Sequence, residues 1–301
     1  MELTACVYNL ENFFLDEESF INTDKTPLKN EKKLKEMAKT FADIDADIYA
    51  LSEVGGLRSL EIFNETYLHS SYIPLVIKGN SDRGIELGFY IRKSLGLTYE
   101  VKTNTKAVIN FKFEETERNS YGLSRDLQEL YLYKDRSLIC IIFNVHLKSQ
   151  RDMTGRDFRG EKRRKAEFTY CLERYHTVKN ENPTTPLFFV GDFNGNASRF
   201  QTDPEFIRGI HTYDIVDVLD YRDIPREQRA TFYLFKGSER IPVQLDYAFT
   251  TKETLAQILD ATVYRYKNEL QNPKFLPRSR FDIWDNPSDH YPLVFTFQLL
   301  K

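Results

Sequence analysis

Short apolar runs, each followed by polar residues, recur along the chain and predict β-strands. The most apolar of them, Leu138–Phe143, shows no polar alternation, as expected of a central strand buried on both faces. We expect strands at thirteen runs in all: Leu3–Tyr8, Ile48–Leu51, Tyr72–Lys78, Glu86–Arg92, Leu97–Lys102, Val108–Phe113, Asp126–Tyr133, Leu138–Val145, Leu187–Val190, Thr231–Phe235, Val243–Phe249, Ala261–Tyr266 and Tyr291–Phe297.

Three segments repeat apolar residues at helical spacing instead. In Asn30–Ile44 the residues Leu34 and Phe41 fall on one face among lysines and glutamates. The same spacing recurs in Gly160–Lys179 and, more weakly, in Leu57–Leu68. So few helices beside so many strands predict an α+β fold, in which two sheets pack face to face and a helical layer covers the outside of each.

The composition fits one soluble globular domain. No linker or repeat divides the 301 residues, so we expect a single domain over 1–301. Apolar residues make up 41% of the chain and the net charge is −3, which suits a large core under a charged surface. The longest purely apolar run is far below the ~18 residues of a membrane span, and no basic segment typical of a signal peptide precedes the first strand. We therefore expect a cytoplasmic protein without a transmembrane helix, with secretion after removal of a leader as the alternative. The sequence does not determine the oligomeric state, for which we favour a monomer.

Polar side chains able to carry chemistry stand near the ends of six predicted strands. They belong to short motifs: Tyr8-Asn9-Leu10-Glu11-Asn12, Leu51-Ser52-Glu53-Val54, Asn144-Val145-His146, Gly191-Asp192-Phe193-Asn194, Leu245-Asp246-Tyr247 and Ser288-Asp289-His290. Carboxylate, amide and imidazole groups are the ligands, bases and donors that phosphoryl chemistry around Mg²⁺ uses. The motifs therefore predict a metal-assisted site that cleaves phosphoesters.

In this order, the six motifs resemble those of the endonuclease/exonuclease/phosphatase superfamily, which includes deoxyribonuclease I. The resemblance extends from Asn9 to Val294. It implies a four-layer αββα sandwich with two mainly antiparallel sheets and a site at one edge of both. The His146 motif looks more like those of deoxyribonuclease I, sphingomyelinases and bacterial nuclease-like members than like the Asn-Ala-Tyr of abasic-site endonucleases. The residues around Asp246 also depart from the Trp-Cys-Asp-Arg of inositol polyphosphate 5-phosphatases.

The resemblance also implies a role for each motif residue. Glu53 would be the principal ligand of Mg²⁺, for which Mn²⁺ is a substitute, with Asn9 near the metal and Asp289 a further or water-mediated ligand. Asp192 would deprotonate the attacking water, assisted by the amide of Asn194. His290, paired with Asp246, would donate to the phosphate. His146 would contact the phosphate or the leaving group.

Elementary chemistry supports this distribution but leaves alternatives for single residues. A carboxylate held by an amide can take a proton from water, and a histidine kept cationic by a neighbouring aspartate can stabilise charge on a phosphoryl oxygen. Taken alone, Asn9 or Asn194 is more typical of a turn or a helix cap, and Asp246 could be a buried structural partner. An unpaired Glu53 at a buried strand end would be costly, which favours function.

The substrate is the least determined part of the prediction. Segment Lys148–Lys165 follows His146 and holds eight basic and three acidic residues, a local charge of +5 that would attract a polyanion. Arg83, Arg125 and Lys148 are candidate phosphate contacts, although the arginines could equally form surface salt bridges. We therefore predict a nuclease acting on DNA or RNA. A phosphatase or phosphodiesterase for a small or lipid phosphoester and a non-catalytic binding module are the alternatives.

Overall fold

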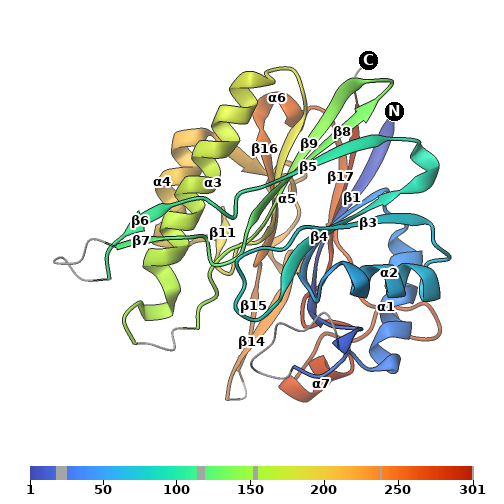
Figure 1. Ribbon diagram of the computed structural model, residues 1–301. Coiled ribbons are helices and arrows are strands. Elements are labelled where there is room, and N and C mark those ends of the chain that lie inside the picture. The colour runs from blue at the N-terminus through green and yellow to red at the C-terminus, as the bar shows by residue number, and fades with distance from the viewer. Residues whose placement is uncertain (18–25, 114–118, 152–154, 238, 300–301) are drawn as a thin grey trace.

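The computed structural model describes residues 1–17, 26–113, 119–151, 155–237 and 239–299. Two six-stranded sheets pack face to face at its centre, and the longer helices lie on their outer sides (Figure 1). The predicted four-layer arrangement is therefore confirmed. Across this part of the chain no helix has the length and apolar character needed to cross a lipid bilayer.

The first sheet has the strand order β17-β18-β1-β2-β4-β3. Its neighbouring strands are antiparallel except β1 and β2, which run parallel. The strands are β1 (Glu2–Phe13), β2 (Ile48–Val54), β3 (Tyr72–Val76), β4 (Glu86–Arg92), β17 (Ile258–Val263) and β18 (Leu293–Gln298).

The second sheet has the order β13-β16-β10-β9-β8-β5. It too is antiparallel apart from one parallel pair, β9 with β10. The strands are β5 (Thr98–Thr103), β8 (Leu127–Lys134), β9 (Ser137–His146), β10 (Leu187–Asp192), β13 (Ile215–Asp217) and β16 (Asp246–Thr251). Both sheets are mainly antiparallel, as expected.

Two helices cover the outer face of each sheet. α1 (Glu31–Ile44) and α2 (Leu57–Tyr67) lie on the first sheet, and α3 (Glu161–Glu181) and α4 (Pro204–Tyr213) lie on the second (Figure 1). The side chain of Asn30 caps α1 by accepting from the backbone N–H of Lys33. Shorter helices are α5 (Val218–Tyr221), α6 (Lys252–Leu255), α7 (Arg280–Trp284) and the single turns η2 (Lys93–Leu95), η3 (Phe158–Gly160) and η4 (Arg226–Gln228).

Aromatic side chains fill both kinds of interface. Between the sheets, the ring of Phe188 lies 4.7 Å from that of Phe297. Under the helices, Phe41 of α1 stacks on Tyr49 of β2 at 4.3 Å, and Phe168 of α3 stacks on Phe189 of β10 at 6.1 Å. Burial of such large rings on each face is the main force that holds the layers together.

Several sequence predictions need correction. The run Val243–Phe249 is not one strand, because β15 ends at Val243 and β16 begins at Asp246. The predicted strands near Thr231 and Val108 belong to small hairpins outside the two large sheets. α4 was missed because its apolar spacing is interrupted by Gly209 and polar residues. The strands that lie outside the two large sheets are β6 (Ile109–Phe111), β7 (Asn119–Tyr121), β11 (Ala197–Ser198), β12 (Gln201–Thr202), β14 (Phe232–Lys236) and β15 (Glu239–Val243).

Candidate active site

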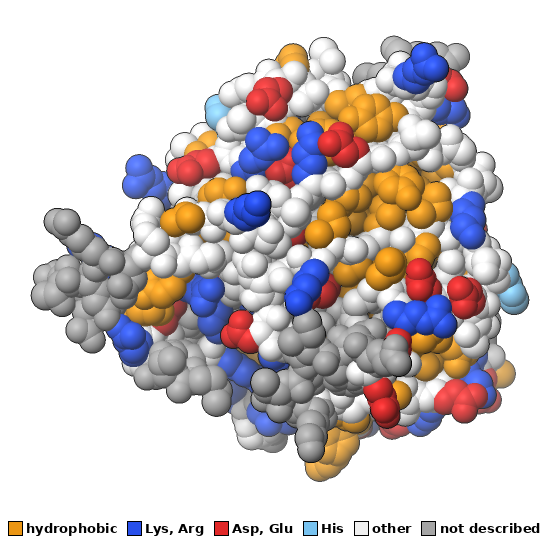
Figure 2. Space-filling view, viewed as in Figure 1, with side chains coloured by type: hydrophobic (Ala, Val, Ile, Leu, Met, Phe, Trp, Pro, Cys, Tyr) orange, Lys and Arg blue, Asp and Glu red, His pale blue; other side chains and the backbone are white. Residues whose placement is uncertain are grey.

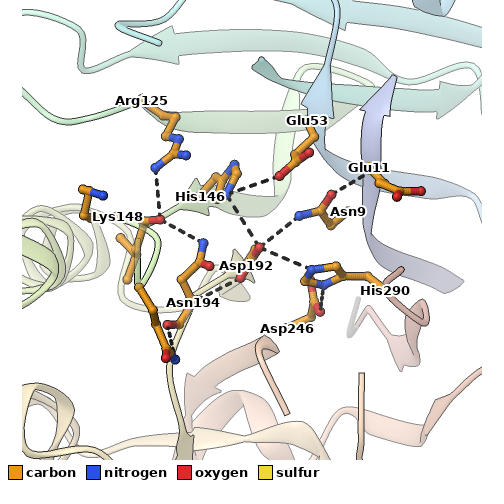
Figure 3. Close-up of polar contacts among 12 residues, drawn as sticks. Asn9, Glu11, Glu53, Arg125, His146, Lys148, Asp192, Asn194, Asp246 and His290 are labelled. Atoms are coloured by element: carbon orange, nitrogen blue, oxygen red, sulfur yellow. Dashed lines mark hydrogen bonds and ion pairs between the residues drawn. The ribbon is translucent and has the colours of Figure 1, made fainter. Parts of the chain in front are cut away.

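The polar motif residues meet at one edge of the sandwich (Figure 3). Asn9 lies toward the end of β1, and its Nδ2 donates to Oδ2 of Asp192 at the end of β10, at 2.9 Å. Because β1 and β10 belong to different sheets, this hydrogen bond crosses the sandwich. β16 starts at Asp246, which pairs in register with Asp192. Residues far apart in the sequence therefore share one buried site.

Gly191 allows β10 to pass close to β9 beside the site. Its φ is 133°, a value that L side chains rarely adopt, and a Cβ at this position would clash with the backbone oxygen of Val145. Glycine is thus required on two separate grounds. The close approach places Asp192 opposite its register partner His146.

Asp192 is at the centre of the arrangement. Its Oδ1 accepts from the backbone N–H of Asn194 at 2.8 Å, while its Oδ2 lies 3.6 Å from Nε2 of His146 and 3.9 Å from Nε2 of His290. Burial, opposed by nearby His290 and reinforced by the carboxylate of Asp246, raises the pKa of Asp192 to about 7. A carboxyl with this pKa can accept and release a proton near neutral pH.

Asn194 contacts Asp192 through its backbone, whereas the sequence predicted a contact from its side-chain amide. The side-chain amide of Asn194 donates to the backbone oxygen of Leu147 at 3.0 Å, and only the backbone N–H reaches the Asp192 carboxylate. The residue has a left-handed backbone, with φ at 52°. Asn194 therefore fixes the turn and links it to the end of β9.

His290 is held by Asp246 as predicted. Its Nδ1 lies 2.7 Å from Oδ2 of Asp246, and its backbone N–H donates to the hydroxyl of Ser288. Burial acts to lower the pKa of His290, but the Asp246 carboxylate outweighs it and raises that pKa well above its ordinary value. The ring centre of Phe232 lies 5.0 Å from that of the His290 imidazole. A cationic imidazole thus presents Nε2 to the site.

His146 has the opposite character. Burial, with the positive charge of Arg125 as the next cause, lowers its pKa well below the ordinary value. Its Nε2 lies 4.0 Å from Oε1 of Glu53. Since the ring is neutral, this contact is not an ion pair, and the site contains one neutral and one charged imidazole.

Glu53 reaches the site through an unusual backbone. Its φ is 61°, and the pairing of β2 with β4 is irregular between Leu51 and Val54. A glutamate in the left-handed region costs about 1 kcal/mol or more. Its Oε2 accepts from the N–H of Asn12 at 2.9 Å, and Oε1 faces His146. Such strain is typical of functional positions and directs the carboxylate toward the other site residues.

The carboxylates that could bind a metal ion come from the first sheet and its loops. Burial, together with the nearby carboxylates of Glu11 and Glu53, raises the pKa of Asp289 to about 6. Glu11 is paired with Lys33 at 2.7 Å and Lys29 at 3.5 Å, which leaves Glu53 and Asp289 as the carboxylates suited to a hard divalent cation. The side-chain oxygen of Asn9 accepts from the N–H of Glu11, so a metal bound by this oxygen would share it with that hydrogen bond.

A second cluster is less suited to a metal. Within the described residues, Asp192, Asp246 and His290 offer ligand atoms that lie within 4.8 Å of one another. However, Oδ2 of Asp246 is engaged with Nδ1 of His290, and both oxygens of Asp192 accept hydrogen bonds, so few oxygen atoms of this cluster are free for a metal. This cluster fits proton transfer better than metal binding.

The three candidate phosphate contacts differ in how their side chains are held. Arg83 donates from Nη2 to Oδ1 of Asn12 at 2.5 Å, and Arg125 lies 3.4 Å from the backbone oxygen of Leu147. The positive charge of each lowers the pKa of His146, so both lie close to the site. Lys148 turns its ammonium toward backbone oxygens of its own loop, including that of Arg151 at 2.6 Å.

Two charged residues of α3 are buried: Arg164, which was wrongly counted with the basic segment expected to attract a polyanion, and Glu167, which the sequence did not single out. Glu167 accepts from the N–H of Ser124 at 2.8 Å and from the N–H of Lys148 at 2.7 Å. Arg164 is paired with Glu205 and donates to the backbone oxygen of Lys148 at 3.1 Å. Both lie on the apolar stripe of α3, where a charged residue is itself a sign of a buried partner. They hold the loops that carry Arg125 and Lys148.

Comparison with known proteins identifies the fold. No family model and no curated protein sequence matches the chain. Among solved structures, truncated TDP2 from Caenorhabditis elegans has a TM-score of 0.61 at 18% identity, covering 98% of this chain and 97% of that one. TDP2 from D. rerio, complexed with a single-strand DNA product, has a TM-score of 0.61 at 15% identity, covering 99% of each chain.

Bacterial proteins are equally similar. A mannosyl-6-phosphatase from Bacteroides thetaiotaomicron has a TM-score of 0.59 at 16% identity and covers 99% of this chain and 100% of that one. An endonuclease/exonuclease/phosphatase family protein from the same organism has a TM-score of 0.61 at 18% identity, with 99% and 96% coverage. The chain therefore has the endonuclease/exonuclease/phosphatase fold, as its motifs predicted.

Proposed function

We propose that this protein is a divalent-metal-dependent phosphoesterase of the endonuclease/exonuclease/phosphatase kind, and that its substrate is a phosphodiester of DNA or RNA. One observation carries the proposal: the buried Asp192 lies between the Asn9 amide, a neutral His146 and a cationic His290. An acid with a pKa near 7, a charged donor and a neutral imidazole are the parts that hydrolysis of an anionic ester requires.

The metal would be Mg²⁺, with Mn²⁺ as a substitute, held by Glu53 and Asp289 with Asn9 beside it. When bound, such a cation neutralises charge on the phosphoryl oxygens and lowers the pKa of a water. In this chain Asp192 would receive the proton of the attacking water. His290, kept charged by Asp246, would donate from Nε2 to a phosphoryl oxygen. His146, together with Arg83 and Arg125, would contact the phosphate or the leaving-group oxygen.

In the basic segment Lys148–Lys165, of which residues 152–154 lie outside the described part, Arg164 is buried, but five basic side chains are exposed and favour nucleic acid as the substrate: Arg151, Arg156, Arg159, Lys162 and Lys165. In Figure 2, Lys and Arg side chains gather at the lower left, near the start of α3. A positive flank beside the site would bind successive phosphates of a strand. The TDP2 structure complexed with single-strand DNA product is consistent with such a substrate on this fold.

A small phosphate ester is the second candidate substrate, favoured by a cavity beside the site. The cavity has a volume of about 280 Å³ and is lined by Asn196, Phe200, Arg229 and Gln244, among other residues. Gln244 donates to the backbone oxygen of Asp246, so one wall of the cavity contacts the start of the strand that carries this residue. The mannosyl-6-phosphatase neighbour fits this alternative.

A substrate screen with and without metal tests the proposal. The purified protein is incubated with plasmid, single-strand oligonucleotides, RNA and small phosphate mono- and diesters, in Mg²⁺, in Mn²⁺ or in chelator. We expect cleavage of nucleic acid that requires metal and weakens as salt rises. Intact nucleic acid together with metal-dependent phosphate release from a small ester would assign the second candidate. Hydrolysis that persists in chelator would contradict a metal-dependent site.

A further inference from the structure

An exposed group of aromatic side chains lies next to the proposed active site in the sequence. Phe275 is 90% exposed, Phe281 68% and Trp284 65%, and these three residues are called the aromatic rim below. The rings of Phe281 and Trp284 meet edge to face at 4.9 Å. Hydrophobic side chains are visible at the lower edge of Figure 2, in the region where Figure 1 places α7. Large hydrophobic side chains exposed close together in the chain typically mark a binding surface.

The aromatic rim is attached to ordered parts of the molecule. Asp285, at the end of α7, pairs with Lys32 of α1 at 2.9 Å. Arg280 donates to the backbone oxygen of Phe235, and Arg240 to that of Pro277, each at 3.3 Å, which ties the segment to the β14–β15 hairpin. A capping box at Ser279 starts α7. The rings are therefore presented by a defined surface.

This surface is linked to the site through the chain and through the β14–β15 hairpin. Trp284 lies six positions before His290, so their Cα atoms are no more than about 21 Å apart. The hairpin that holds the rim also carries Phe232, whose ring covers His290 at 5.0 Å. The rim precedes β18 of the first sheet, whereas the basic segment Lys148–Lys165 follows β9 of the second. A strand that crosses the site can thus contact both flanks.

Charge on the rim favours a polyanion. Arg240, Arg278 and Arg280 are exposed, and the guanidinium of Arg278 lies 5.7 Å from the ring centre of Phe275. Of the neighbouring acidic groups, Asp282 accepts from the backbone N–H groups of Arg278 and Ser279, and Asp285 is paired with Lys32, while Glu239 beside Arg240 is exposed. Exposed rings among arginines match a ligand that has both flat bases and phosphates.

We propose that the aromatic rim binds the single-stranded flank of a nucleic-acid substrate, with its rings stacked on nucleobases and its arginines near the phosphates. This inference rests on the proposed nuclease function and adds to it a preference for unpaired strands, because bases within a duplex are not free to stack on protein rings.

Trp284 is the chain's single tryptophan, so its fluorescence reports on the rim alone. The intact protein is titrated with a 12-nucleotide single-strand DNA in chelator, where no cleavage interferes. We expect saturable quenching by the single strand and much weaker quenching by the same sequence as a duplex. The double variant Phe275→Ala/Phe281→Ala, which keeps Trp284, should bind the single strand about 100-fold more weakly, at about tenfold per ring.

Two controls separate stacking from other effects. Leu270→Ala removes an aliphatic side chain that is 80% exposed in the same segment, and it should leave the affinity unchanged. Trp284→Phe keeps a stacking ring, and a labelled strand should bind it nearly as tightly as it binds the wild type. Hydrolysis of a small phosphodiester should be the same in all these variants, since none of these side chains contacts the proposed catalytic groups.

Other outcomes would overturn the inference. If the double variant binds the strand as the wild type does while the wild type still cleaves nucleic acid, the rim proposal fails and the proposed function stands. Quenching by phosphatidylserine vesicles but not by DNA would assign the rim to a membrane surface instead. A wild type that neither binds nor cleaves any nucleic acid would remove both proposals.

Discussion

At the scale of single residues, the site depends on conformations and charges that most residues avoid. Glu53 and Asn194 have positive φ values of 61° and 52°. Asp192 has a pKa near 7 because it is buried beside a second carboxylate. Gly191 is the backbone position on which this geometry depends most, since no side chain fits between β10 and β9 there. Left-handed backbone occurs in turns elsewhere in the molecule, but at Glu53 and Asn194 it places residues of the proposed site.

Gly191→Ala tests that dependence. The added Cβ would clash with the Val145 backbone at an unfavourable φ, so we expect the free energy of unfolding to fall by about 3 kcal/mol or more. Gly122→Ala is the matched control, because its Cβ would meet only the side chain of Asn80 at 3.5 Å. Denaturant unfolding of both variants gives the comparison. Equal stability of the two would show that the β9–β10 approach is looser than described.

At the scale of elements, α3 both covers the second sheet and positions the loops around the site. Its apolar stripe packs Phe168 on Phe189, while Glu167 on the same stripe accepts from the N–H groups of Ser124 and Lys148. These loops carry Arg125 and follow His146. One buried carboxylate therefore couples the packing of a helix to the placement of candidate substrate contacts.

Glu167→Gln should disturb this coupling with little change in volume. The amide can accept from one of the two N–H groups but turns a donor toward the other, which costs about 1–3 kcal/mol of stability. We expect kcat/KM on a phosphodiester to fall about tenfold, mainly through KM, when measured well below the Tm. Glu173→Gln, at an exposed position of the same helix, should change neither quantity. Lower stability with unchanged kcat/KM would limit Glu167 to a structural role.

The difference between what the sequence predicted and what it missed has a physical basis. Strand ends were predictable at Asn9, His146 and Asp192, because apolar runs stop there and parallel strands end at a shared edge. The left-handed backbone of Glu53 was not, because glutamate has no preference for that region. Glu167 was missed because its partners are backbone N–H groups of distant loops, which leave no trace in a motif. The Asn194 contact depended on side-chain direction, which only coordinates reveal.

At the scale of the whole molecule, the site exists because two sheets come together. Asn9, Glu53 and Asp289 come from the first sheet and its loops, and His146, Asp192 and Asp246 come from the second. The Asn9–Asp192 hydrogen bond and the packing of Phe188 on Phe297 cross the same interface. The site is therefore assembled only when both sheets pack together, and loss of either sheet's packing would separate the proposed catalytic groups.

Replacing Asp192 with asparagine tests the central claim most directly. Asp192→Asn keeps the shape of the side chain but removes its ability to accept a proton, and circular dichroism with a thermal melt verifies that the variant is folded. On a phosphodiester in saturating Mg²⁺, we expect kcat to fall about 100-fold or more, while His211→Ala, an exposed histidine outside the site, keeps wild-type activity. A folded Asp192→Asn protein with kcat close to that of the wild type would contradict the account.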